Sequence, residues 1–140
     1  MFEEGHVYYG HVVLAGKNKF FLVVRNCPRH AYIALINTNL PKLPSRFDTT
    51  ILRSCFLPVA PDEILPSRAC GLTYQSWISL YSKGGRTLPT LPQSTHNQYQ
   101  RCGVLSTQRF DQLRESIYGC DTLKEKHKKV LLGEQPCEPG

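Results

Sequence analysis

Three apolar runs near the start of the chain constrain its fold more than any other feature. Residues 10–14 (GHVVL) and 19–24 (KFFLVV) flank the turn-forming segment 16–18, and residues 32–36 (YIALI) follow. Runs rich in β-branched and aromatic residues around short turns are typical of antiparallel hairpins. The third run ends in the polar trio 37–39 (NTN). The sequence therefore predicts a β-meander at the start of the fold, with polar side chains at one rim of a small sheet.

Length and composition predict a single domain. The chain has 140 residues, of which 41% are hydrophobic, which suffices for one core but not for two. No apolar run approaches the roughly 20 residues that a membrane-spanning helix needs. Residues 1–6 (MFEEGH) are acidic and hold no long apolar stretch. We therefore expect no signal peptide, no membrane partner and a cytoplasmic protein.

The cysteines of this chain are expected to be reduced thiols, several of them packed as small hydrophobes, because we expect no secretion signal. There are six: Cys27, Cys55, Cys70, Cys102, Cys120 and Cys137. Cys27 and His30 have the spacing of metal ligands, but no second pair completes a tetrahedral zinc site. We therefore predict a turn at residues 27–30 and neither a metal nor another cofactor.

The positive charge of the chain indicates an anionic partner. A net charge of +6 favours nucleic acid, the commonest partner of basic proteins. Much of the excess lies in Lys124, Lys126, Lys128 and Lys129. These four lysines also fit the solvated face of a helix, whose dipole favours cations near its C-terminal end. The charge therefore leaves both interpretations open.

The middle of the chain alternates strands with loops rich in proline and glycine. Residues 55–59 (CFLPV) predict a short strand, which Pro58 places at a sheet edge. Residues 72–81 (LTYQSWISLY) predict another strand. Long loops are expected at residues 40–54 and 82–97, where turn formers predominate.

Two helices are predicted at the end of the chain. The first covers residues 107–118 after the N-cap Ser106. The second covers residues 123–132, and Thr122 with Glu125 three residues later fits a capping box. The last seven residues, 134–140, are expected to fray. The sequence thus predicts a β-rich α+β protein with two C-terminal helices.

The order of these parts resembles the PemK/MazF/Kid superfamily. The resemblance rests on an opening Gly-x-Val-Val-Leu at residues 10–14, a basic residue entering an apolar strand with Leu-Val-Val at 22–24, and a third strand ending at Thr38. Residues 102–106 (CGVLS) and the basic segment 123–128 (LKEKHK) are similar to the later parts of one branch of that family. The similar pieces are discontinuous and cover about two-thirds of the chain.

The resemblance implies a fold, an activity and partners. The implied fold is a small SH3-like β-barrel over residues 1–104, a helical segment at 105–133 and a tail at 134–140, all in one domain. Many members of the family are ribosome-independent endoribonuclease toxins that pair as homodimers and are held by an antitoxin. The resemblance therefore implies RNA and an antitoxin or other protein as partners, and a homodimer.

Two residues match the functional positions of the family. Lys19 stands where the toxins usually carry a catalytic arginine at the start of the second strand, and Thr38 matches the threonine or serine that ends the third. Lysine offers phosphate a point charge, whereas arginine offers a planar fork. The branch carries two acidic residues in the later strand, and both are absent from residues 75–80 (QSWISL).

Cleavage of RNA by its own 2′-OH needs a base, an acid and a cation near the phosphorane. Imidazole is the usual acid and base near neutral pH, so His11, His30 and His96 are candidates, and His11 is the catalytic candidate because its strand pairs near Lys19. Equally, His11 fits a packing role, Lys19 a solvated charge and Thr38 a turn former.

Three further residues are predicted to bind nucleic acid. Arg25 and Arg29 would supply positive charge, and an exposed Trp77 would stack a base. Trp77 also fits the core or an interface.

Two functions therefore remain open. The first is an RNA-binding protein that acts as a metal-independent endoribonuclease toxin, with Lys19, Thr38 and His11 at the site. The second is a catalytically inactive barrel that binds nucleic acid or a protein partner.

Overall fold

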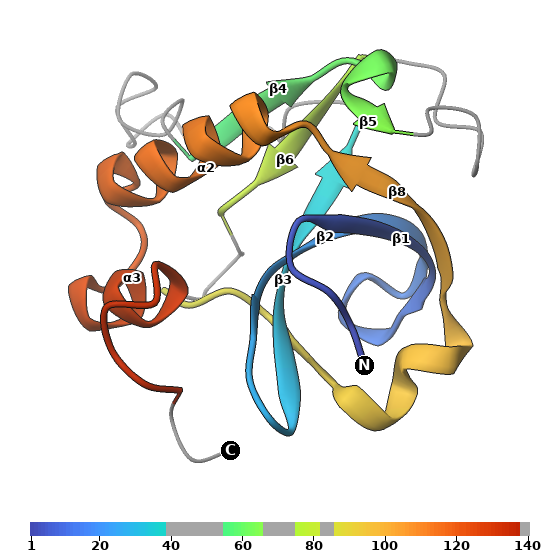
Figure 1. The fold of residues 1–140 in the computed structure, drawn as a ribbon, viewed down its shortest axis with the longest axis horizontal. Coiled ribbons are helices and arrows are strands. Elements are labelled where there is room, and N and C mark those ends of the chain that lie inside the picture. Colours follow the sequence, from blue (N-terminus) through green and yellow to red (C-terminus); the bar gives the residue numbers. More distant parts are fainter. Residues whose placement is uncertain (39–54, 66–74, 82–85, 138–140) are drawn as a thin grey trace.

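The predicted meander is confirmed. The structure, a computed structural model, describes residues 1–38, 55–65, 75–81 and 86–137. The first three strands follow one another and pair antiparallel (Figure 1). They are β1 (His6–Val12), β2 (Lys17–Asn26) and β3 (His30–Asn37). The turn predicted at residues 27–30 joins β2 to β3, as expected.

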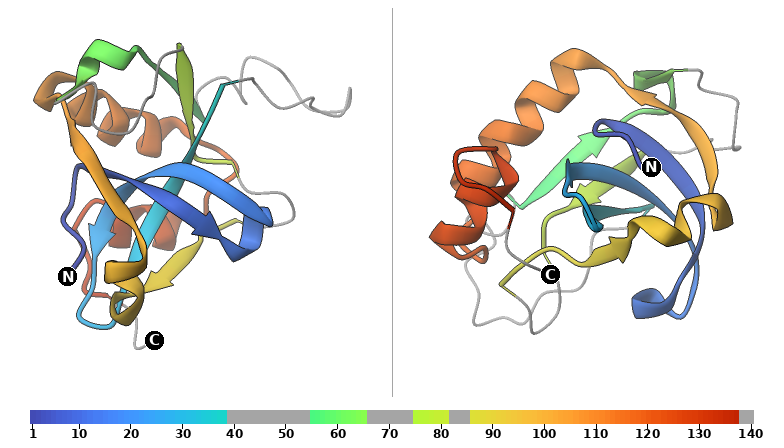
Figure 2. Two further views of the ribbon diagram at one scale, coloured as in Figure 1. Left: turned by 90° about the vertical axis from the view of Figure 1, so that its right-hand side faces the viewer. Right: turned by 60° about the horizontal axis from the view of Figure 1, so that its bottom comes forward.

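All strands in the described part of the chain belong to one antiparallel sheet. The remaining five are β4 (Phe56–Val59), β5 (Ile64–Leu65), β6 (Ser76–Ser79), β7 (Thr90–Pro92) and β8 (Gln100–Leu105). The order across the sheet is β4-β6-β3-β2-β1-β8-β5, and β7 pairs with β3 outside this path. The two end strands, β4 and β5, are consecutive in the chain, and the short 3₁₀ helix η2 (Pro61–Glu63) joins them. The sheet therefore curves into a half-barrel (Figures 1 and 2).

This architecture confirms the β-rich α+β class. The exposed Pro58 lies in β4, an end strand of the sheet, as predicted. Among the described residues, no helix is long and apolar enough to cross a membrane.

Each face of the central strands carries its own apolar cluster. Leu22 and Ala34 belong to the larger cluster, which includes Leu113 from the first C-terminal helix. Phe21 and Ile33 belong to the smaller one, which is closed by residues from the N-terminal segment. Successive side chains of a strand point to opposite faces, so the apolar run of β2 supplies both clusters.

The two C-terminal helices lie together on one side of the sheet (Figure 2). They are α2 (Thr107–Gly119) and α3 (Glu125–Leu131). Ser106 is the N-cap of α2, since its side chain accepts a hydrogen bond from the Arg109 backbone N–H at 3.3 Å. This confirms both the helix and its predicted cap.

The predictions around α3 need two corrections. The N-cap is Lys124 rather than Thr122, and the Thr122 hydroxyl lies 3.2 Å from the Cys120 sulfur instead. Lys128 is only 4% exposed, so the interpretation of the four lysines as a solvated helix face does not hold for this residue. Its ammonium donates to the Tyr118 carbonyl and to the Glu125 carboxylate, both at 3.0 Å. These partners satisfy a buried charge that the helix pattern alone does not reveal.

The prediction of reduced thiols is wrong. Cys27 is bonded to Cys137, and Cys55 is bonded to Cys120. Cys102 is disulfide-bonded as well, and the described residues contain no free cysteine. Cysteines far apart in the sequence become neighbours only through the fold, so spacing gave no sign of these pairs. Disulfides are typical of oxidising compartments, and the cytoplasmic location stays a prediction.

Several segments differ from the sequence expectations. Residues 90–97, expected as loop, lie in β7 and the 3₁₀ helix η3 (Gln93–Gln98). The first strand ends at Val12, and Val13 and Leu14 form an exposed 3₁₀ turn. Residues 134–137 do not fray, because Cys137 ties them to the sheet. The loop predicted at 40–54 and the start of the strand predicted at 72–81 lie outside the described residues.

Candidate nucleic-acid interface

Three polar or aromatic side chains form one row across β2, β3 and β6. Phe20 pairs with Ile36, so the next step along both strands sets Lys19 beside Asn37. The Lys19 ammonium donates a hydrogen bond to Asn37 Oδ1, which confirms that register. Asn37 in turn pairs with Trp77. Directly opposed residues point to the same face of a sheet, so Lys19, Asn37 and Trp77 share one face; we call them the Lys19 row.

An aromatic ring extends the Lys19 row on its other side. Gly10 in β1 pairs with Lys19, and the Tyr99 ring lies directly over Gly10. A Cβ added to Gly10 would be 2.6 Å from that ring, so only glycine lets the ring approach this closely. The Tyr99 hydroxyl donates to the His11 carbonyl at 2.8 Å, and the ring meets Phe21 edge to face at 5.0 Å. These contacts fix the position of the ring.

The environment of Lys19 lowers the pKa of its amine. Burial, followed by the nearby Lys17 ammonium, lowers the pKa of the Lys19 amine from its ordinary value. Lys17 and Lys19 are two residues apart in β2 and therefore share a face. Lys19, Asn37, Trp77 and Tyr99 are all half-buried. The row thus offers a partly desolvated cation between two half-exposed aromatic side chains.

The hydrogen bond from Lys19 also orients Asn37. Because Asn37 Oδ1 accepts from the ammonium, the amide nitrogen of Asn37 keeps two N–H donors for a ligand. Thr38 follows Asn37 directly and is exposed at the end of β3. Donors and a hydroxyl therefore lie at the end of the sheet where the cation and the aromatic rings lie.

The structure brings some of the predicted site residues together and separates others. Lys19, Thr38 and Trp77 lie at the same end of the sheet. His11 is next to Gly10 and pairs with Asn18, so its side chain points to the face opposite that of Lys19. Its carbonyl, rather than its imidazole, contributes to the site through Tyr99. The catalytic roles of Lys19, Thr38 and His11 stay predictions.

Arg25 and Arg29 lie at the other end of the meander. Arg25 is six residues after Lys19 in β2, a distance of about 20 Å along a strand. Its guanidinium Nη1 is 4.0 Å from a Glu4 carboxylate oxygen. Arg29 lies, exposed, in the turn between β2 and β3. The two arginines therefore do not join the Lys19 row.

Two members of the interface were not predicted from the sequence. The sequence places Asn37 at a polar rim without naming a partner, and Tyr99 follows the loop predicted at residues 82–97 without an element of its own. The hairpin register carries the signal for Asn37, since a β2–β3 pair that aligns their apolar residues sets it beside Lys19. No local pattern indicates Tyr99, because its place over Gly10 depends on a contact between distant segments.

No metal site is formed by the described residues, since no three His, Cys, Asp or Glu side chains of theirs gather at one place. Cys27, half of the Cys27 and His30 pair, is bonded to Cys137 and has no thiolate to offer.

No protein-family model matches the chain, and no curated protein matches its sequence. The resemblance to the PemK/MazF/Kid superfamily, and with it the SH3-like barrel type, therefore stays a hypothesis.

Proposed function

We propose that this protein binds single-stranded RNA through the Lys19 row and Tyr99, on a PemK/MazF-like barrel. One observation carries the proposal. The Lys19 ammonium, which donates to the Asn37 amide, lies in a cross-strand row between the aromatic side chains of Trp77 and Tyr99. Each component suits a different part of a nucleotide. Aromatic rings stack on unpaired bases, and each such contact contributes about 1–3 kcal/mol. The ammonium attracts phosphate as a point charge.

Single-stranded RNA fits this surface better than a duplex does. The bases of a single strand are free to stack on Trp77 and Tyr99, whereas those of a duplex are stacked on one another. The Asn37 amide and the Thr38 hydroxyl add hydrogen-bonding groups for base edges or the 2′-OH. The net charge of +6 supports association with any polyanion and does not select RNA by itself.

Binding is better supported than cleavage. Cleavage by 2′-OH attack needs a proton acceptor beside the cation. Among the described residues, Lys19 forms no ion pair with a carboxylate, and the His11 imidazole points to the other face. The proposal is therefore the RNA-binding module, and the endoribonuclease toxin with its antitoxin is the alternative that the experiment separates from it.

A salt titration of RNA binding tests the proposal. Fluorescence anisotropy with a labelled single-stranded oligoribonucleotide gives the slope of log K against log salt. We expect Lys19→Ala to reduce this slope by about 0.7, the share of one phosphate contact on a single strand. Lys126→Ala is the matched control, because Lys126 is an exposed lysine on α3. Equal slopes and affinities for the two variants would overturn the proposal.

The integrity of the same RNA separates the two functions. Intact RNA after long incubation with the wild-type protein supports the binding module. Cleavage that is lost in both Lys19→Ala and Thr38→Ala would replace the binding module with the endoribonuclease.

A further inference from the structure

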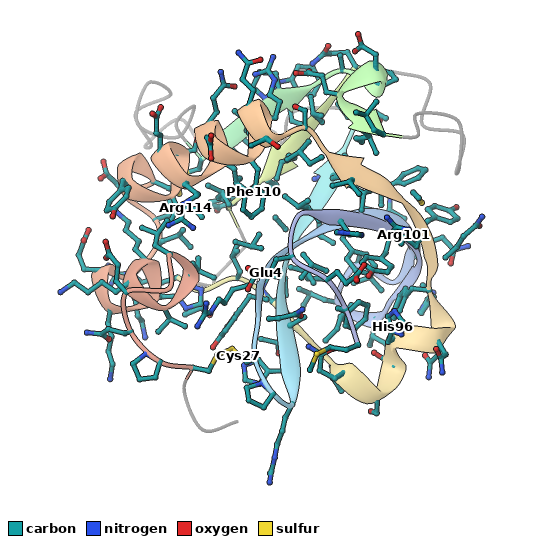
Figure 3. All side chains as sticks on the ribbon, in the orientation of Figure 1. Glu4, Cys27, His96, Arg101, Phe110 and Arg114 are labelled. Atoms are coloured by element: carbon teal, nitrogen blue, oxygen red, sulfur yellow. A yellow bond between two sulfur atoms is a disulfide. The ribbon has the colours of Figure 1, made fainter. Side chains whose placement is uncertain are left out.

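A second group of charged side chains lies where the N-terminal segment meets β1 and β8. Figure 3 labels Arg101 at this place. Arg101 Nε donates a hydrogen bond to His6 Nδ1 at 2.7 Å. The same His6 Nδ1 lies 3.1 Å from a Glu3 carboxylate oxygen. We call Glu3, His6 and Arg101 the His6 cluster.

The two contacts of His6 Nδ1 exclude each other. A neutral imidazole has one nitrogen that accepts and one that donates, whereas an imidazolium donates from both. Arg101 can donate to Nδ1 only while that nitrogen is unprotonated. Glu3 can accept from Nδ1 only once it carries a proton. In the Arg101-bound state the neutral imidazole therefore carries its proton on Nε2, and protonation of His6 places a second proton on Nδ1, which exchanges Arg101 for Glu3.

The exchange changes the charge of the cluster. With a neutral imidazole, the charges of Glu3 and Arg101 cancel. With an imidazolium, Glu3 is paired with His6 and the Arg101 charge is left over. The imidazolium also repels the guanidinium, and the side chain of Arg101 is already exposed.

The surroundings of His6 shift this exchange to lower pH than for an ordinary imidazole. Burial, and to a smaller extent the Arg101 charge, lower the pKa of His6, while Glu3 opposes this change. Glu3 and Arg101 are the charged groups that act on His6 in the described part of the chain. Tyr8 is the other titratable group nearby, and its hydroxyl accepts from the Glu3 backbone N–H at 3.2 Å. The lowered pKa of His6 therefore favours the neutral imidazole, and with it the Arg101 contact.

We propose that the His6 cluster is an acid-gated oxyanion site, in which protonation of His6 turns its Nδ1–H to Glu3 and frees Arg101 to bind a phosphate or sulfate group. The proton comes from solvent and stays on His6 Nδ1. The guanidinium fork matches two oxyanion oxygens at once. The site differs from the Lys19 row in every residue and does not rest on RNA binding.

Sulfate is the suitable probe, because its charge does not change between pH 7.5 and 5.0, whereas that of inorganic phosphate does. We expect sulfate to bind about tenfold more tightly at pH 5.0, within the usual range of coupling between two sites. Binding is followed by NMR through the Arg101 Nε–H and His6 ring signals of the full chain. An affinity independent of pH overturns the proposal.

Reciprocal linkage supplies a second readout. If protonation of His6 favours sulfate, saturating sulfate must raise the apparent pKa of His6 by the same factor. A tenfold coupling corresponds to one pH unit. A His6 pKa that sulfate leaves unchanged contradicts the mechanism.

Two variants separate the gate from general electrostatics. In His6→Gln the side chain at position 6 cannot titrate, so we expect the pH dependence of sulfate binding to disappear. Arg101→Lys keeps the positive charge but loses the guanidinium fork, and we expect weaker binding at pH 5.0. Folding of each is checked from the dispersion of its NMR spectrum. If folded His6→Gln keeps the tenfold change, the gate is not His6 and the proposal fails.

Discussion

The two ends of the β2–β3 pair carry polar side chains for different purposes. At the Arg25 end, Gln93 from η3 approaches three acceptors with its amide nitrogen: Asn26 Oδ1 at 2.9 Å, and the carbonyls of Cys27 and His30 at 3.2 and 3.4 Å. Its amide oxygen accepts from the Phe2 backbone N–H at 2.9 Å. At the Lys19 end, the lysine makes one side-chain hydrogen bond within the described residues, to Asn37.

The Arg25 end is therefore closed by the chain itself. The N-terminal segment, the β2–β3 turn, η3 and the C-terminal segment all meet there, and the Cys27–Cys137 disulfide ties two of them together. Figure 3 labels Glu4 and Cys27 on this side. A Cβ added to Gly133 would be 3.3 Å from Arg25 Nη1, so the C-terminal segment also covers that guanidinium. Arg25 therefore contacts other segments of the chain at one end of the β2–β3 pair, whereas Lys19, with the same charge, is half-buried at the other end and makes one side-chain hydrogen bond among the described residues.

The largest expected effect follows from removing the disulfide at the closed end. Cys27 and Cys137 are 110 residues apart, and removal of a native disulfide typically costs about 2–5 kcal/mol. We expect the double variant Cys27→Ser, Cys137→Ser to lose about that much unfolding free energy in guanidinium chloride. RNA affinity of the folded fraction should be unchanged. A loss below about 1 kcal/mol would show that this disulfide does not hold the closed end together.

Gln93→Ala should weaken the same end by a smaller amount. The substitution removes several hydrogen bonds and leaves the Phe2 N–H without its partner, which costs about 2 kcal/mol. Urea unfolding of this variant and of Gln98→Ala measures the effect, since Gln98 is an exposed residue of the same 3₁₀ helix. Equal stability of the two variants would show that the Gln93 contacts are not cohesive.

Gly10→Ala tests the packing of Tyr99 at the Lys19 end, which we call the open end. The added methyl group displaces the ring, and we expect a loss of about 1–2 kcal/mol together with weaker RNA binding. A double-mutant cycle with Tyr99→Ala isolates this contact, because Gly10→Ala should cost almost nothing once the ring is absent. If the stability losses of Gly10→Ala and Tyr99→Ala are strictly additive, the contact between the two residues does not cause the loss in Gly10→Ala.

The smallest expected effect is a dependence of stability on pH through His6. The folded protein holds the pKa of His6 below its ordinary value, so the unfolded chain takes up its proton first as the pH falls. The stability contributed by neutral His6 is therefore present above the unfolded pKa of about 6.5. It decreases as the pH falls from there toward the folded pKa. Unfolding free energies at pH 7.5 and 5.5 should differ more for the wild type than for His6→Gln; equal differences would contradict this role.

The meander and the helices could be predicted from local sequence, whereas the closed end could not. Runs of β-branched and aromatic residues around short turns identify β2 and β3, and Ser106 identifies the start of α2, because these signals lie within a few residues of one another. The strand β8 was missed, since residues 100–103 (QRCG) show no alternation and contain a glycine. The role of Gln93 and the pairing of Cys27 with Cys137 depend on contacts between distant segments.

The candidate site could be predicted in part for the same reason. Lys19, Thr38 and Trp77 lie in strands or at strand ends whose apolar patterns fix the register, so their common location follows from the pairing. Arg25 was assigned to the same surface by charge alone, and charge contains no information about position along a strand. The contact between Tyr99 and Gly10 cannot be predicted from the residues around either position, because the two are far apart in the sequence.

A comparison of Lys19→Ala with Arg25→Ala in RNA binding tests the central claim most directly. Both substitutions remove one positive charge from β2, one at the open end and one at the closed end. Measured by fluorescence anisotropy on folded protein, Lys19→Ala should weaken binding about tenfold, as loss of a charged contact does. Arg25→Ala should leave the affinity within about twofold of the wild type. An equal loss in both variants, or a larger loss for Arg25→Ala, would contradict the assignment of the two ends.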